Sequence, residues 1–199
     1  STLIRMFNNL ESPTSGEIII DGNNISQLSK SQLRKKRQKV SMIFQHFNLV
    51  KRSTVLRNVL SGRGGYHPTW KMILGLFPKE DKVKAMNALE RVNILDKYDQ
   101  RSDQLSGGQQ QRIGVVRALA AEQDIILMDE PFGALDPITR DTLQDLVKKL
   151  QQQLGKTFIF VTHDMDEAIK LADKICIMTN GQVVQYDTPD NILRSPAND

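Results

Sequence analysis

The chain has 199 residues, of which 39% are hydrophobic and 25% charged, and its formal net charge is +4. These values are ordinary for a globular protein, and the absence of any run of about 18 apolar residues excludes a typical membrane-spanning helix. We expect no signal peptide at the start of the chain. The single cysteine, Cys176, is expected to be a buried, reduced thiol of a cytosolic protein.

The first 45 residues predict two strands and a basic helix. Residues 16–25, GEIIIDGNNI, are typical of a strand and a tight turn, and residues 40–45, VSMIFQ, predict a second strand that ends on Gln45. The basic stretch 30–39, KSQLRKKRQK, is expected to be a solvated helix face. The alternative is a surface for nucleic acid or anionic lipid, although no aromatic residues interleave with the basic ones.

Residues 46–119 have few strand signals and contain an amphipathic helix, so they predict a mostly helical lobe inserted into the core. The core is then expected to comprise residues 1–45 and 120–199. In the stretch TWKMILGLF, Trp70, Ile73, Leu74 and Phe77 fall at helical spacing. We expect these side chains to pack inside the lobe; the alternative is a docking surface for a partner.

Apolar strands and helices alternate in the last third of the chain. Residues 124–130, DIILMDE, resemble a strand that is buried on both faces, and residues 157–164 and 174–187 continue the strand pattern. The segment 136–156, between the first two of these strands, has helical period. Its apolar face is formed by Leu143, Leu146, Val147, Leu150 and Leu154. This alternation predicts an α/β fold with a largely parallel central sheet.

Polar side chains follow three of these strands. Asp129 and Glu130 end the most apolar strand, Gln45 ends an earlier one, and His163 follows a later one. In open α/β sheets the carboxyl edge is where ligands bind. Asp129 suits a Mg²⁺ ion reached through water, and Glu130 suits a base that positions an attacking water. The alternative is a structural histidine and a surface acid pair.

The stretch LSGGQQQRIGVVRAL, residues 105–119, predicts an anion site at a helix start. Ser106 is a good N-cap residue, and Gly107 and Gly108 let a phosphate approach the backbone N–H groups closely. We expect another chain to hold most of that anion. The alternative is a capped helix without a ligand.

The combination of LSGGQ, ILMDEP, ALD and VTHD resembles the nucleotide-binding subunits of ABC transporters over essentially the whole chain. The resemblance implies a P-loop NTPase (RecA-like) core with an inserted helical subdomain, ATP and Mg²⁺ as ligands, and a head-to-tail dimer of ATPase subunits. It gives catalytic roles to Glu130 and His163. The residues that it assigns to nucleotide are Ser1, Thr2, Gln45, Ser106, Gly107, Gly108, Gln109 and Asp136, and those that it assigns to metal are Ser1, Gln45 and Asp129.

One departure from the family concerns its phosphate loop, G-x-x-x-x-G-K-[ST]. The chain begins STLIRMFNNL, so the resemblance makes Ser1 the last residue of that loop and implies that the preceding strands and glycines are missing. A chain without the loop loses a nest of backbone N–H groups and a lysine for the phosphates. We therefore expect the 199 residues alone to be inactive, but able to cover ATP held by an intact partner.

The resemblance also divides along the chain. Residues 1–112 are similar to ATPases of phosphonate importers, and residues 113–199 to those of glycine betaine (osmoprotectant) importers, which leaves a natural relative and a chimera both open. An importer ATPase implies transmembrane permease partners, an indirect link to a substrate-binding protein, no nucleic acid, and a place at the cytoplasmic face of the membrane. The alternatives are a soluble ABC ATPase without membrane partners and an inactive fragment.

Overall fold

The computed structural model describes residues 2–43 and 48–197. The chain divides into two compact units, residues 1–161 and residues 162–199. Two of the predicted site residues, Ser1 and Gln45, lie outside the described residues. Within the described part, no helix has the length and apolar character that a bilayer crossing requires.

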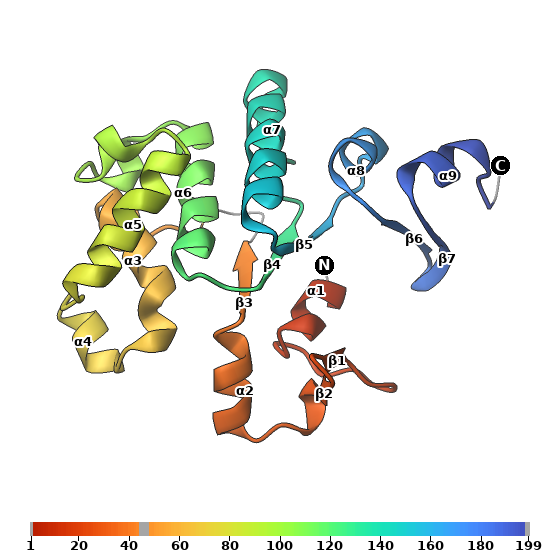
Figure 1. The fold of residues 1–199 in the computed structure, drawn as a ribbon, viewed down its shortest axis with the longest axis horizontal. Helices are drawn as coiled ribbons and strands as arrows, with labels where there is room; N and C mark the ends of the chain where they lie inside the picture. Colours follow the sequence, from red (N-terminus) through yellow and green to blue (C-terminus); the bar gives the residue numbers. More distant parts are fainter. Residues whose placement is uncertain (1, 44–47, 198–199) are drawn as a thin grey trace. The chain divides into compact units, whose positions relative to one another are not determined.

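A parallel three-stranded sheet lies at the centre of the first unit (Figure 1). Strand β4 (Ile125–Asp129) runs between β3 (Val40–Ile43) and β5 (Thr157–Val161), and it is parallel to both. The three middle residues of β4 are each only 1% exposed. A strand paired on both edges and covered on both faces needs a continuous apolar run, which is what the sequence has there. The predicted α/β fold with a parallel sheet is confirmed.

Two helices flank the sheet residues. Helix α1 (Thr2–Phe7) places the fully buried Ile4 in a cluster with Val40 of β3 and Leu127 of β4. Helix α7 (Pro137–Leu154) follows β4, begins with Pro137 in its first turn, and ends at Gly155 in a left-handed conformation with φ 59°. This proline-first, glycine-last order is a regular helix signature. Its buried apolar side chains are Leu143, Val147 and Leu150.

The segment before β3 forms a small hairpin and a basic helix. Strands β1 (Ile19–Ile20) and β2 (Asn23–Asn24) are antiparallel, and the turn residues Asp21 and Gly22 both have positive φ, at 49° and 70°. An Asp-Gly pair favours such a turn. A 3₁₀ turn (η1, Ile25–Gln27) leads to α2 (Lys30–Arg37), which has no buried residue. The predicted solvated basic helix is therefore confirmed.

The helices between β3 and β4 pack against one another (Figure 1). Helices α3 (Val55–Ser61), α5 (Lys79–Arg91) and α6 (Gly107–Ala120) bury Val59, Leu89 and Ile113 completely. Short elements connect them: η2 (Gly62–Tyr66), α4 (Thr69–Ile73), η3 (Leu95–Lys97) and η4 (Ser102–Gln104). The predicted boundaries of the helical lobe, residues 46–119, stay a prediction.

The prediction that the apolar residues of α4 pack inside the lobe is wrong for three of them. Trp70, Ile73 and Leu74 are 56%, 79% and 62% exposed. Helix α4 has only five residues and its chain turns away at Gly75, which has φ 67°. A single turn of helix cannot bury a whole apolar stripe, so these side chains remain on the surface.

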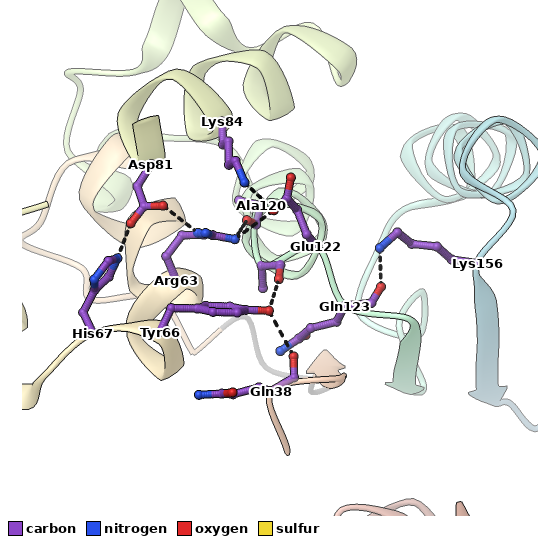
Figure 2. A network of polar contacts seen from close by, with 11 residues as sticks. Gln38, Arg63, Tyr66, His67, Asp81, Lys84, Ala120, Glu122, Gln123 and Lys156 are labelled. Atoms are coloured by element: carbon purple, nitrogen blue, oxygen red, sulfur yellow. Dashed lines mark hydrogen bonds and ion pairs between the residues drawn. The ribbon is translucent and has the colours of Figure 1, made fainter. Parts of the chain in front are cut away.

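A polar network ties η2 and α5 to the carboxyl end of α6 (Figure 2). The Arg63 guanidinium donates to Asp81 Oδ1 at 2.9 Å and to the carbonyl of Ala120 at 3.3 Å. Asp81, which is 3% exposed, is also paired with the ring of His67. Arg63 further contacts Glu122 Oε2 at 3.2 Å. The network thus anchors the helical elements to the segment that leads into β4.

The second unit contains a hairpin and two helices. Strands β6 (Ile175–Thr179) and β7 (Gln182–Asp187) are antiparallel and joined by Asn180 and Gly181, both at positive φ. Helices α8 (Met165–Leu171) and α9 (Pro189–Arg194) precede and follow the hairpin. The expectation of a buried Cys176 is wrong, because its thiol is exposed. Side chains alternate along a strand, and the buried position in β6 is Ile175.

Candidate functional site

The carboxyl end of β4 carries the two predicted acids. Asp129 is the last residue of β4 and pairs in register with Val161 of β5. Glu130 follows, and its backbone N–H donates to the carbonyl of Val161 at 2.9 Å, so the sheet ladder continues for one more bond. Both side chains are half-buried. The strand therefore delivers two carboxylates to the carboxyl edge of the parallel sheet, where ligands of such folds bind.

Glu130 has an unusual backbone conformation, with φ 45°. This left-handed region costs an L-residue roughly 1–3 kcal/mol when it is held there by the surrounding structure. The next residue is Pro131, which adds to the cost because a residue before proline is restricted. Strained residues of this kind cluster at functional sites, so the geometry favours the predicted role of Glu130.

The turn after Glu130 is anchored by buried side chains and a helix cap. Phe132 is 1% exposed and Leu135 is 8% exposed. Asp136 is the N-cap of α7 and accepts a hydrogen bond from the backbone N–H of Thr139 at 3.0 Å. Bonds from the side chain and backbone of Thr139 hold the pKa of the Asp136 carboxyl below its ordinary value of 3.8. Asp136 therefore caps the N-terminus of α7 in its own chain. Its contact with nucleotide stays a prediction.

At the start of α6, the predicted cap forms a capping box. Ser106 Oγ accepts from the N–H of Gln109 at 3.4 Å, and Gln109 Oε1 accepts from the N–H of Ser106 at 3.1 Å. Each of these two side chains thus accepts a hydrogen bond from the backbone N–H of the other residue. Among the described residues, the N–H groups of Gly107 and Gly108 have no acceptor, and they are the donors that an anion would meet.

The two glycines have different surroundings. A Cβ on Gly107 would meet no heavy atom within 4 Å, so the space in front of this residue is open. A Cβ on Gly108 would collide with the Cγ2 methyl of Thr139 in α7. Gly108 is therefore required by close packing of α6 against α7, whereas the space in front of Gly107 is open. The contact of either glycine with an anion stays a prediction.

Sequence reasoning missed the role of the glutamines that follow. Gln110 donates to the carbonyl of Leu105 at 2.9 Å, within the start of its own helix. Gln111, by contrast, is 2% exposed, and its Nε2 donates to the carbonyl of Pro131. The signal was available, because Gln111 lies on the same helical face as the buried Val115 and Ala118.

The remaining predicted residues are dispersed. Thr2 is the exposed first residue of α1. His163 is exposed in the second unit, in a loop fixed by a bond from the Asp164 N–H to Thr162 Oγ1 at 3.0 Å. The structure brings Asp129 and Glu130 together, while the predicted convergence of Gln45 and His163 with them stays a prediction.

A cavity of about 300 Å³ lies elsewhere, between the carboxyl-terminal parts of α5, α6 and α7. Its polar lining includes Lys84, Arg91, Glu122 and Lys156, and no predicted site residue borders it. In residues 2–43 and 48–197 there is no group of three or more His, Cys, Asp or Glu side chains that could hold a metal. The predicted site residues at the end of β4 and the start of α6 therefore lie outside the lining of this cavity.

Comparisons with known proteins identify the family of the chain. The ABC transporter family matches residues 1–133. The chain is 59% identical over 189 residues to the "Phosphonates import ATP-binding protein PhnC" of Staphylococcus aureus (strain bovine RF122 / ET3-1), covering 95% of this chain and 73% of that protein. The protein of the same name from Staphylococcus haemolyticus (strain JCSC1435) gives the same identity and coverage.

Solved structures show the same fold. CbiO1 of Clostridium perfringens, part of the ABC transporter complex cbiONQ, superposes with a TM-score of 0.84 at 28% identity, over 98% of this chain and 75% of that one. The ATP-binding cassette MJ0796, a dimer bound to ADP and Pi, superposes with a TM-score of 0.78 at 33% identity, over 94% of this chain and 79% of that one. The chain therefore belongs to the ABC transporter family, as an ATP-binding subunit that hydrolyses ATP to energise solute import.

Proposed function

We propose that this chain powers the import of phosphonates. The observation that carries this proposal is the 59% identity, over 95% of the chain, to proteins named as phosphonates import ATP-binding proteins. The match extends across residues 112 and 113, where the sequence resemblance changes from phosphonate to osmoprotectant importers. Phosphonate is thus favoured over glycine betaine as the solute of the whole importer.

In the proposed mechanism Glu130 is the base. Its carboxylate orients an attacking water and accepts its proton, in a position that the sheet and the strained backbone define. His163 steadies the terminal phosphate from the loop after β5. Catalysis of this kind consists mainly of positioning and charge stabilisation, because phosphoryl transfer leaves little covalent chemistry for the protein.

Mg²⁺ is proposed as the metal of the reaction. The half-buried carboxylate of Asp129 at the end of β4 fits the water shell of this ion, and oxygen donors are the ligands it prefers. Ser1 and Gln45 are its other proposed contacts. Bound there with ATP, the ion neutralises charge on the phosphate oxygens.

A second ATPase subunit is proposed to complete the site, in a head-to-tail dimer. The support is the exposed start of α6, where the space in front of Gly107 is open next to a closed capping box. A helix N-terminus attracts anions through its N–H groups and its dipole. The anion is the γ-phosphate of ATP held by the partner.

Docking to transmembrane permease subunits is proposed for α4, which places the chain at the cytoplasmic face of the membrane. Trp70, Ile73 and Leu74 form an exposed apolar surface of the kind that marks interaction sites. After Cys176 is replaced by Ser, cysteines at Trp70 or Ile73 should crosslink to the permease. Crosslinks from Leu193 of α9 alone would contradict this docking surface.

The solute is tested with the complete importer in lipid vesicles, because the ATPase subunit does not itself contact the solute. ATP hydrolysis should rise when the substrate-binding protein is loaded with a phosphonate, and stay at its basal rate with glycine betaine. Stimulation by glycine betaine alone would contradict the proposal. We propose no nucleic-acid partner. Hydrolysis that requires ribosomes or DNA would contradict this and would support the alternative, a soluble ABC ATPase.

A further inference from the structure

We propose that Gln111 is a positioning residue for Glu130, acting through the carbonyl of Pro131. The inference rests on the proposed role of Glu130 as the base. Gln111 lies on α6, five residues after the N-cap Ser106, and its side chain reaches the turn that follows β4. Through this bond it holds the backbone that presents Glu130.

The chemistry of this position distinguishes a directional bond from ordinary packing. Gln111 is 2% exposed and shares its helical face with Val115 and Ala118, which are equally buried. Burial of an amide costs free energy unless it is hydrogen-bonded, and an apolar residue of the same size would fill this space without that cost. Only the Nε2 end of the amide can donate to a carbonyl, so the bond to Pro131 specifies one orientation of the turn.

The turn needs such a restraint because Glu130 is held at φ 45°. Three hydrogen bonds fix it from different sides. The N–H of Glu130 donates to Val161 at 2.9 Å, the N–H of Gly133 donates to the carbonyl of Glu130 at 3.3 Å, and Gln111 holds the carbonyl of Pro131. The first two bonds belong to the sheet and to the turn itself. Gln111 supplies a bond from a helix, α6, that lies outside the sheet and the turn.

The same helix meets the far end of the turn. Gly108 packs so closely against Thr139 that no Cβ fits between them, and Thr139 is bonded to the N-cap Asp136. The start of α6 therefore contacts Pro131 directly and reaches the far end of the turn through Thr139. A shift of the anion-binding end of α6 is transmitted to the backbone of Glu130 by two contacts, of which the Gln111 bond is the directional one.

The test compares steady-state hydrolysis by the complete ATPase subunit with two substitutions. Gln111→Met keeps the volume and removes the donor, and Gln111→Asn keeps the amide but is one methylene too short to reach Pro131. We expect kcat to fall about three- to tenfold in both, while KM for ATP stays within about twofold. The control is Val116→Ala on the same helix, a substitution at a fully buried position that should lower the melting temperature but removes no side-chain hydrogen bond to the turn. Its kcat should stay near that of the wild type.

A second measurement separates positioning from a general structural effect. In a Glu130→Gln background there is no carboxylate base for Gln111 to position, so Gln111→Met should cause no further loss of kcat. An equal loss in both backgrounds would overturn the proposal, and so would both Gln111 variants failing to fold, since the bond would then serve the fold as a whole. If Glu130→Gln itself leaves turnover unchanged, the proposed function of Glu130 fails. If only the Gln111 variants leave it unchanged, the positioning role fails alone.

Discussion

Removal of the Asp81 carboxylate should destabilise the first unit more than removal of any single surface charge. Asp81 is 3% exposed and accepts from Arg63, which is itself 7% exposed (Figure 2). Asp81→Ala leaves this guanidinium buried with the carbonyl of Ala120 and with Glu122, whose side chain is 53% exposed. Breaking a buried pair from one side costs about 3–5 kcal/mol. Because Glu122 remains as a partial counter-charge, we expect the lower end, about 3 kcal/mol.

The assay is urea unfolding followed by circular dichroism, with thermal melts as a second measure. For a chain of this size, about 3 kcal/mol corresponds to a fall in melting temperature of roughly 6–12 °C. The matched control is Asp96→Ala, which removes a surface pair with Lys97 in which the carboxylate is 68% exposed. Exposed pairs of this kind contribute about 0–1 kcal/mol. Equal and small effects for Asp81 and Asp96 would refute the assignment of a buried network.

Two further predictions concern the start of α6 and the acid limb of stability. Gly108→Ala should lower the free energy of unfolding by about 1–3 kcal/mol, because a Cβ there forces Thr139 away. Gly107→Ala should not lower it. Equal effects of the two substitutions in urea unfolding would contradict the difference in packing. The hydrogen bond from Lys84 holds the pKa of Glu122 below its ordinary value of 4.5. The stability it contributes is therefore present above that value and is lost as the pH falls through the folded-state pKa. Glu122→Gln should reduce the pH dependence of the urea midpoint below about pH 4.5, and an unchanged slope would show that the lowered pKa does not affect stability.

The elements that local chemistry determines could be predicted from the sequence. The apolar run of β4 needs no partner to be recognised, and the pairs Asp21-Gly22 and Asn180-Gly181 adopt positive φ with little cost. The helix that follows Asp136 is indicated by its helical period. The same local signals located Glu130 at the strand end, although its left-handed backbone is set by the tertiary structure and has no sequence signature.

The features that sequence reasoning missed depend on contacts between distant segments. The role of Gln111 depends on the turn at Pro131, which is 20 residues away in the sequence and lies beside α6 only in the fold. Close packing against Thr139 gives Gly108 a structural role that the sequence does not reveal. Trp70 was expected in a core because helical spacing reports a shared face, not what covers that face. Each of these three features is decided by packing between distant segments, which a sequence pattern within one segment does not report.

The central claim, that Glu130 is the base of an ABC ATPase, is tested most directly by Glu130→Gln in the complete subunit. The substitution keeps size and hydrogen bonding but removes the proton acceptor. Hydrolysis should fall at least about a hundredfold, as expected for loss of a general base, while ATP still binds and ATP-bound dimers accumulate. Turnover near that of the wild-type subunit, with no trapped dimer, would contradict the account.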